Sequence, residues 1–432
     1  MTMVQCFSQV IYDHDANYLT SADSEPAEVY ALCMTFTHGP ERFLVPLIAA
    51  ALIASPRPGL AINCAGTSTG STPLTDLATG TYQGFQGGLY TGGVNGRPAA
   101  HRTAGLQIAS QIVPLDTLGN PSASGRVVVI SIGMSNCTQE FSALVPKMIA
   151  DPLRRPQVKP IDCAEGGQAA RDIHHASAAY WDTVYARLRG HGSSPLQPQV
   201  VWLKEAERAP TGQFPASAES LEWDLGAIVR VIHQKLPNVR ACYVSSRIYA
   251  GYATSNLNPE PYAYESGFAV KWLIEAQSGG VDSLNWDPAL GAVQAPWLTW
   301  GPYLWADGLQ PRGDGLTWRC DEYQSDGTHP NDVGRNVVAD TLLAFFQRDE
   351  TTVPWYRAGT VSVVDDTPSP ELRVGPVPAR RRVFMSLSLP SKGVFANVTR
   401  SIGPTRPCSA RTCSPDPGRC ARISTSKGLS VE

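Results

Sequence analysis

The sequence predicts a doubly wound α/β fold, in which helices cover both faces of a mainly parallel sheet. Short apolar runs alternate along the chain with longer segments of helical character, as they do in successive βαβ units. The clearest run, residues 126–132, is an almost unbroken series of β-branched residues, which is typical of a parallel strand buried on both faces. Ligands of such folds bind beyond the carboxyl ends of the strands, so functional residues are expected there.

Strand and helix candidates follow one another through the middle of the chain. Strands are expected at residues 126–132, 158–163, 200–204 and 239–245. Helical segments are expected at residues 140–151, after residue 172 and at 218–236. Crossovers between such strands are right-handed. Residues 65–125 are rich in Gly, Thr, Ser and Pro and predict an ordered loop rather than a helix.

Composition bounds the classes of protein to consider. The chain has 432 residues, of which 43% are hydrophobic and 17% charged, enough for one large core with appendages. A net charge of −3 supplies no positive field for a nucleic acid, so no such partner is expected. The ten cysteines form no C-x-x-C pair and have no zinc-type spacing with histidine. Five lie in the central region, so at least one thiol there stays free or pairs between chains.

An apolar run at residues 43–54 is shorter than the roughly 20 residues of a membrane-spanning helix. It has the length of a signal-peptide core and precedes a small-x-small cleavage triplet at Gly59 to Ala61. A start at Met34 would make residues 34–61 a signal peptide and residues 1–33 a doubtful extension. The protein would then be secreted or periplasmic, with no stable membrane insertion. A buried core helix is the alternative. No lipid anchor is expected at Cys64, which lacks a good lipobox.

The chain changes character after residue 356, where Pro, Arg and Ser dominate. Residues 357–399 predict a linker and part of a small immunoglobulin-like module, resembling those that end many bacterial secreted proteins. Residues 400–432 lose the alternating pattern and are expected to be disordered.

Two separated motifs carry the chemistry. Ser135 follows the strand at 126–132 on a turn that begins with Gly133. Asp326 and His329 lie three residues apart, just before an apolar helical run. A serine hydroxyl is a poor nucleophile unless an imidazole takes its proton and a third group orients that imidazole. Ser135, His329 and Asp326 would fill these roles.

The strand, Gly133-Met134-Ser135-Asn136, and the late Asp326-Gly327-Thr328-His329-Pro330 segment resemble the SGNH (GDSL-like) hydrolase superfamily. The resemblance covers residues 62–356. It implies a flavodoxin-like three-layer sheet and a serine esterase with a Ser-His-Asp acyl-enzyme mechanism and no cofactor or metal. The form of the serine motif resembles the carbohydrate acetylesterase branch, which favours O-acetyl groups on a sugar as the substrate.

The resemblance also implies donors to the oxyanion that forms during acyl transfer. The backbone N–H of Ser135 is one, and Gly167 is favoured over Gly166 for the second. The third is an asparagine in this superfamily, but the corresponding segment at 201–210 contains none. Lys204 or Asn136 could supply that donor.

An aromatic-rich insertion lies between residues 245 and 326. Flat rings with polar edges stack on sugars, and they also pack in ordinary cores. Charged residues between the rings could add hydrogen-bonding specificity. The candidate substrate-binding residues are Arg247, Tyr249, Tyr264, Glu265, Trp300, Tyr303 and Trp305.

Two other functions are compatible with the sequence. The missing asparagine and the aromatic insertion would also suit a non-catalytic carbohydrate-binding protein on a degenerate SGNH fold. A lipid-directed esterase is the third candidate. The pair His174-His175 lacks a carboxylate at ligand spacing, so no metal is expected, and no nucleotide fingerprint follows a strand. The sequence makes no prediction of the oligomeric state.

Overall fold

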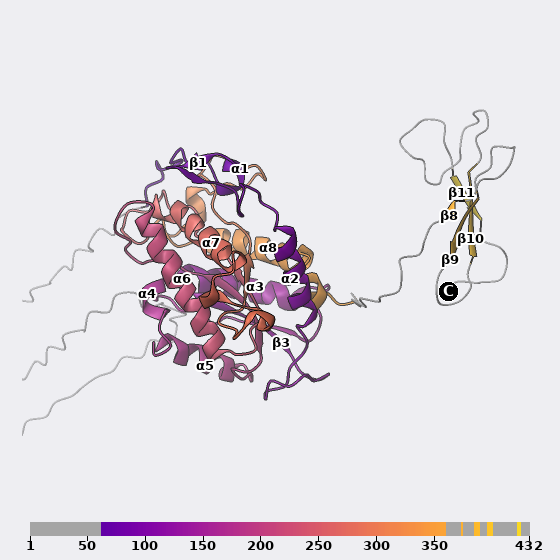
Figure 1. Ribbon diagram of the computed structural model, residues 1–432. Helices are drawn as coiled ribbons and strands as arrows, with labels where there is room; N and C mark the ends of the chain where they lie inside the picture. The colour runs from indigo at the N-terminus through magenta and orange to yellow at the C-terminus, as the bar shows by residue number, and fades with distance from the viewer. Residues whose placement is uncertain (1–61, 360–372, 375–383, 389–394, 401–420, 425–432) are drawn as a thin grey trace, which may run out of the picture. The chain divides into compact units, whose positions relative to one another are not determined.

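The computed structural model describes residues 62–359 throughout (Figure 1). Beyond them it describes the backbone of four short strands between residues 373 and 424. The chain divides into two compact units, Met1–Val361 and Ser362–Glu432. The predicted extension at 1–33 and the predicted signal peptide at 34–61 lie outside the described residues.

The first unit is built on a parallel sheet of five strands. Their order across the sheet is β4-β3-β5-β6-β7, and every neighbouring pair is parallel. Numbered along the chain within this sheet, the order is 2-1-3-4-5, which is the flavodoxin-like arrangement. The strands are β3 (Val127–Gly133), β4 (Val158–Ile161), β5 (Pro198–Lys204), β6 (Ala241–Val244) and β7 (Trp297–Trp300). The doubly wound α/β fold is confirmed.

Helices flank this sheet. Every residue of β3, β5, β6 and β7 is buried, because both faces are covered. Helix α3 packs against α8, and α6 packs against both α4 and α7, so helices gather into layers around the strands (Figure 1). The longer helices are α2 (Ala99–Ser110), α3 (Ser135–Ala150), α5 (Tyr180–Gly190), α6 (Ala216–Lys235), α7 (Tyr262–Ser278) and α8 (Asp332–Arg348). The short ones are α1 (Leu74–Leu77), α4 (Ala170–Ile173), α9 (Val353–Tyr356), η1 (Asp282–Leu284), η2 (Pro288–Leu290) and η3 (Cys320–Glu322).

The aromatic-rich insertion is largely a βαβ unit. Helix α7 and strand β7 follow β6 and add the fifth strand to the sheet. The four residues of β7 are buried, and α7 packs on β7. The sequence prediction missed this unit because tryptophans at both ends of a four-residue strand give a run too short to stand out.

The expectation of loop over residues 65–125 is wrong in part. This segment contains α1, a two-stranded hairpin of β1 (Thr81–Tyr82) and β2 (Phe85–Gln86), and the twelve-residue helix α2. Helix α2 begins directly after Pro98, a residue that suits the start of a helix. Its alanines favour the helix, and that local signal is hidden among the surrounding glycines and prolines.

The second unit contains an antiparallel sheet with strand order β11-β10-β9-β8. Its strands are β8 (Arg373–Val374), β9 (Phe384–Ser388), β10 (Phe395–Arg400) and β11 (Ala421–Ser424). Strand β9 falls in the alternating segment assigned to the immunoglobulin-like module. Strand β11 falls within residues 400–432, where disorder is predicted, and pairs with β10. The rest of that segment lies almost entirely outside the described residues, so the domain assignment beyond residue 359 stays a prediction.

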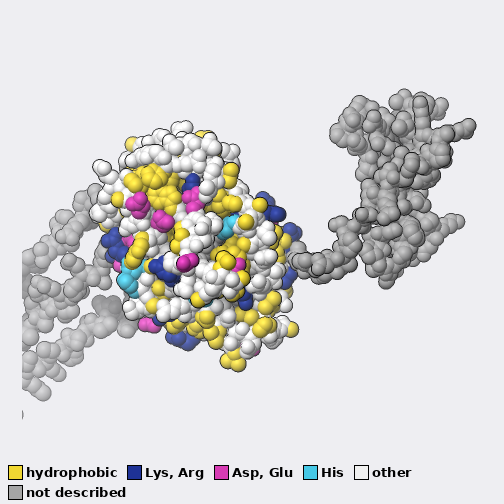
Figure 2. Space-filling model, in the orientation of Figure 1, with side chains coloured by type: hydrophobic (Ala, Val, Ile, Leu, Met, Phe, Trp, Pro, Cys, Tyr) yellow, Lys and Arg dark blue, Asp and Glu magenta, His cyan; other side chains and the backbone are white. Residues whose placement is uncertain are grey.

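In the described part of the chain, no helix combines the length and the apolar character needed to cross a membrane. On the face of the first unit seen in Figure 2, Lys and Arg side chains are interspersed with Asp and Glu rather than gathered by sign.

Candidate active site

Ser135 lies where β3 turns into α3, at the carboxyl edge of the sheet, and is the first residue of that helix. Gly133 makes the turn with a φ of 148°. A Cβ atom at Gly133 would lie 2.0 Å from the carbonyl oxygen of Lys204, so only glycine fits. The neighbouring strands β3 and β5 flank the point where the strand order reverses, which is the usual ligand-binding position in this fold.

A chain of hydrogen bonds joins the three residues predicted from the sequence. Ser135 Oγ lies 2.7 Å from His329 Nε2, and His329 Nδ1 lies 2.5 Å from Asp326 Oδ2. The other carboxylate oxygen, Asp326 Oδ1, accepts the backbone N–H groups of Thr328 and His329 at 3.0 Å each. This arrangement suits a hydroxyl that passes its proton to an imidazole held by a carboxylate.

The loop that carries Asp326 and His329 needs glycine at position 327. Gly327 has a φ of 66°, and a Cβ atom there would lie 2.0 Å from the carbonyl oxygen of Tyr252. The backbone of the loop therefore packs directly against the backbone at Tyr252, and a side chain at position 327 would not fit. It leads into α8, whose N-cap Asn331 accepts hydrogen bonds from Val333 N and Gly334 N.

The carboxyl group of Asp326 stays ionised at ordinary pH. Burial raises its pKa, but the hydrogen bond from the His329 side chain and the two backbone N–H groups outweigh burial and lower the pKa to about 2. A carboxylate in this state accepts the Nδ1 proton of His329 and leaves Nε2 to face Ser135.

A small cavity of about 40 Å³ opens beside Ser135. Gly167, which has a φ of 75°, and Asn136 line it with Ser135. The N–H of Ser135 lies in the first turn of α3, where backbone N–H groups have no acceptor within the helix. The carbonyl oxygen of Gly167 accepts a hydrogen bond from Arg208, which also pairs with Asp172. Arg208 thereby anchors the loop that presents Gly167.

The structure contradicts the expectation that Lys204 donates to the oxyanion. Its side chain is fully buried and Nζ lies 2.6 Å from both carboxylate oxygens of Glu140. Asn136 is also engaged, since Nδ2 donates to the carbonyl oxygen of Thr328 at 3.2 Å. Asn136 therefore ties the start of α3 to the Asp326–His329 loop.

Two of the candidate substrate-binding residues border cavities. Arg247 lines the cavity of Ser135. Glu265 lines an adjoining cavity of about 10 Å³ and accepts hydrogen bonds from Tyr82 at 2.9 Å and from Ser217 at 3.3 Å. The two cavities share Glu207 and Asn258, so they adjoin.

The five aromatic candidates are core residues and do not form a stacking surface. Each is at most 4% exposed, and the polar atom of each ring makes a hydrogen bond within the first unit. They are Tyr249, Tyr264, Trp300, Tyr303 and Trp305. The expectation that these rings bind substrate is wrong, because the segment that contains them uses them for packing.

Several residues that line the cavity of Ser135 were not predicted as site residues. They are Met134, Gln168, Ala169, Ala206, Glu207, Arg208, Leu257, Asn258 and Thr328. Ala206, Glu207 and Arg208 directly follow β5, so the rule that ligands bind at the carboxyl ends of strands could have found them. Asn258 comes from a loop with no such signal. Within the described ranges, no group of three His, Cys, Asp or Glu residues could hold a metal ion.

Glu207 titrates near neutral pH. Burial and a hydrogen bond with Asp224 raise its pKa to about 7, against the opposing effect of Arg171. Because the folded state holds this proton more tightly than the unfolded state, its contribution to stability is present below pH of about 4.5 and is lost as the pH rises through about 7. We expect Glu207→Gln to reduce the fall in Tm between pH 5 and pH 8. Thermal unfolding at closely spaced pH values measures this, and an unchanged fall would contradict it.

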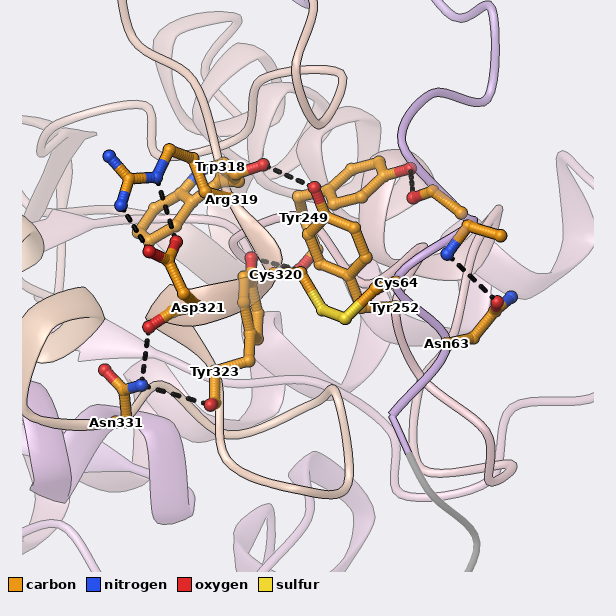
Figure 3. Close-up of a disulfide and its surroundings, with 12 residues drawn as sticks. Asn63, Cys64, Tyr249, Tyr252, Trp318, Arg319, Cys320, Asp321, Tyr323 and Asn331 are labelled. Carbon is orange, nitrogen blue, oxygen red and sulfur yellow. Dashed lines mark hydrogen bonds and ion pairs between the residues drawn. A yellow bond between two sulfur atoms is a disulfide. The ribbon is translucent and has the colours of Figure 1, made fainter.

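A disulfide holds the segment that precedes the Asp326–His329 loop. Cys64 and Cys320 have Cα atoms 5.4 Å apart and are separated by 256 residues in sequence. Figure 3 shows the bridge together with Tyr249, Tyr252 and Tyr323. Asn331 donates to the carbonyl oxygens of Asp321 and Tyr323. The remaining cysteines of residues 62–359, namely Cys137, Cys163 and Cys242, are free and buried. The sequence predicts that at least one central thiol stays free or pairs between chains, and these three cysteines form no disulfide within the described residues.

No family model matches the chain, and no curated protein matches it. Among solved structures, the following two are distantly similar. The Arabidopsis thaliana protein AT4G34215 superposes with a TM-score of 0.26 and 12% identity over 48% of this chain and 67% of its own. The periplasmic domain of a lipopolysaccharide acetyltransferase from Salmonella ser. Paratyphi A gives a TM-score of 0.29 and 13% identity over 58% of this chain and 96% of its own. Similarity at this level carries no argument about activity. The fold is established by the strand order of the chain itself.

Proposed function

We propose that the protein is a secreted serine esterase of the SGNH type that removes short acyl groups, in the first place O-acetyl groups on a carbohydrate. The observation that carries the proposal is the hydrogen-bonded series Ser135, His329 and Asp326, with distances of 2.7 Å and 2.5 Å. A nucleophile, its base and an orienting carboxylate lie within hydrogen-bonding reach at the carboxyl edge of the sheet.

The reaction follows from these positions. Ser135 Oγ attacks the ester carbonyl carbon and its proton passes to His329 Nε2, while the carbonyl electron pair moves onto oxygen. Collapse of this intermediate breaks the bond to the alcohol, which leaves with the proton from His329. Water then attacks the acyl-enzyme with His329 as base, and the acid departs as Ser135 Oγ regains a proton. Asp326 holds the ring and stabilises its charged form.

The size of the cavity supports a short acyl group. One water occupies roughly 10–15 Å³ by this measure, so about 40 Å³ holds about three atoms of that size. An acetyl group has three heavy atoms. A long acyl chain would have to lie elsewhere, which argues against a lipid-directed esterase.

The surroundings of the cavity support a polar alcohol such as a sugar. Gln168, Glu207 and Asn258 line the cavity of Ser135, and Ser217 and Glu265 line the adjoining one. Such groups exchange hydrogen bonds with hydroxyls. The case for a non-catalytic sugar-binding protein is weakened, because the aromatic residues that suggested it are buried in the core.

An extracytoplasmic location is supported by the disulfide between Cys64 and Cys320, since such bonds persist mainly in oxidising compartments. The proposed signal peptide at residues 34–61 would direct the chain there.

The test compares p-nitrophenyl acetate with p-nitrophenyl butyrate and octanoate, each with the purified protein. We expect kcat/KM for acetate to exceed that for octanoate by at least about tenfold, a difference of about 1.4 kcal/mol, because the cavity is small enough to favour a short acyl group. Release of acetate from acetylated xylo-oligosaccharides would then identify the sugar class. A preference for octanoate would establish the lipid-directed alternative. Absence of turnover together with retained glycan binding would establish the binding protein.

A further inference from the structure

Arg247 is a buried cation in the wall of the cavity beside Ser135. It follows β6 at the carboxyl edge of the sheet and is 1% exposed. It lines the cavity together with Ser135 and Gly167. Within residues 62–359, its Nε and Nη2 atoms have no hydrogen-bond partner.

The same fold satisfies another buried guanidinium completely. Arg312 is 8% exposed, and its Nε and Nη2 atoms pair with the carboxylate of Asp314 at 2.8 and 2.6 Å. Its Nη1 atom donates to the carbonyl oxygens of Tyr303 and Trp305. Buried guanidinium groups in this fold can find partners, so the lack of partners at Arg247 Nε and Nη2 is specific to its place in the cavity wall. Burying a charge without a partner is costly, which points to an anion that arrives with the substrate or forms from it.

The carboxylates near Arg247 already have other partners. Glu140 holds Lys204, and Asp326 holds His329. Glu260 accepts hydrogen bonds from Trp305 and from backbone N–H groups. Burial lowers the pKa of Arg247, while these acidic groups act in the opposite direction. An arginine keeps its charge in proteins, so the cavity has a cationic wall.

Acyl transfer needs groups that stabilise the negative charge on the oxyanion, and the positive charge of Arg247 would suit this role. Two backbone N–H groups, those of Ser135 and Gly167, are the donors proposed so far. The asparagine that the superfamily places after the third strand is absent, Lys204 is bound to Glu140, and the side chain of Asn136 is bound to Thr328.

We infer that Arg247 stabilises the oxyanion of the tetrahedral intermediates, in place of the missing asparagine. The inference rests on the proposed function. When Ser135 Oγ bonds to the carbonyl carbon, the electron pair of the C=O bond moves to oxygen, and the negative charge forms beside the guanidinium. The charge is in place before the reaction and costs no reorganisation, which is the condition for a large electrostatic effect. On collapse the electron pair returns to the carbonyl and the alcohol leaves.

The experiment measures kcat and KM for phenyl acetate, a neutral ester, with Arg247→Met and Arg247→Lys. Removing one oxyanion-stabilising group lowers kcat by roughly 10²–10³-fold, so we expect a loss of this size in Arg247→Met, with KM changed by less than about threefold. Arg247→Lys keeps the positive charge, so we expect its kcat to be at least about tenfold higher than that of Arg247→Met. Added guanidinium at millimolar concentration should restore part of the activity of Arg247→Ala.

A matched control separates chemistry from stability. Arg312→Met removes a buried guanidinium that lies outside the cavity, so it should lower Tm while kcat of the folded protein stays within about threefold. Equal kcat in wild type and Arg247→Met would overturn the inference. If kcat fell equally in Arg247→Met and Arg247→Lys, and guanidinium did not restore the activity of Arg247→Ala, Arg247 would serve only packing. That result would also overturn the inference.

Two further outcomes are distinguishable. A loss seen with 4-acetoxybenzoate and not with phenyl acetate would assign Arg247 to binding of an anionic substrate, which would overturn the oxyanion role. If Ser135→Ala hydrolyses phenyl acetate as fast as wild type, or if wild type does not hydrolyse it, the proposed function is wrong. The inference about Arg247 is then wrong as well. Loss in Ser135→Ala with full activity in Arg247→Met would refute the inference alone.

Discussion

Replacing Ser135 by alanine is expected to lower kcat for p-nitrophenyl acetate by at least about 10⁴-fold, because loss of a serine nucleophile leaves only the residual catalysis of the oxyanion site. Ser135 Oγ hydrogen-bonds with His329, and removing one hydroxyl changes little packing. We therefore expect Tm to fall by no more than about 3 °C. Steady-state kinetics and thermal unfolding measure both quantities on the same preparation.

Ser142→Ala is the matched control for this variant. Ser142 lies on the same helix, α3, and its hydroxyl donates to Asp162 at 2.7 Å outside the cavity. We expect its kcat to remain within about twofold of wild type. If Ser135→Ala retained more than about a tenth of wild-type activity while Ser142→Ala behaved as wild type, Ser135 would not be the nucleophile.

Removing the disulfide with Cys64→Ser is expected to have the second large effect. A bridge that closes a loop of 256 residues restricts the unfolded chain strongly, and such bridges typically contribute about 2–4 kcal/mol. For a unit of this size that free energy corresponds to roughly 3–6 °C in Tm. We also expect kcat to fall by a few fold, since Cys320 lies in η3 shortly before the loop that carries Asp326 and His329. Calorimetry and the acetate assay measure the two effects.

A reducing agent provides the control for the disulfide. It should lower the Tm of wild type toward that of Cys64→Ser, and it should leave the variant unchanged. The buried thiols of Cys137, Cys163 and Cys242 are present in both proteins, so they cannot produce this difference. A Tm that is equal in wild type and in Cys64→Ser without reductant would show that the bridge contributes nothing.

The sequence predicts four of the five strands of the sheet and the three hydrogen-bonded side chains because each depends on local signals. Strand β3 is rich in β-branched residues, and Gly133 at its end marks the turn that follows. Asp326 and His329 lie on one short loop before a helix. The meeting of Ser135 and His329 depends on tertiary packing. Helix α8, which begins shortly after the Asp326–His329 loop, packs against α3, which begins at Ser135.

The sequence does not predict the pairing of residues that meet only in three dimensions. Lys204 ends a strand and could face solvent or substrate, but its partner Glu140 lies 64 residues earlier on α3. The aromatic candidates have the composition of a sugar site, yet the sheet gains β7 from that same segment and buries them. Arg247 was predicted only as one of seven substrate-binding candidates, because its lack of a partner is visible only when its neighbours are in place.

The proposed function requires Ser135 to be a nucleophile that is activated by His329. The most direct measurement is covalent labelling with a fluorophosphonate, followed by mass spectrometry of the peptides. We expect one adduct, on Ser135, in wild type, no adduct in Ser135→Ala, and labelling slowed by at least about 100-fold in His329→Ala. An adduct on another residue, or labelling of Ser135 at the same rate without His329, would contradict the account.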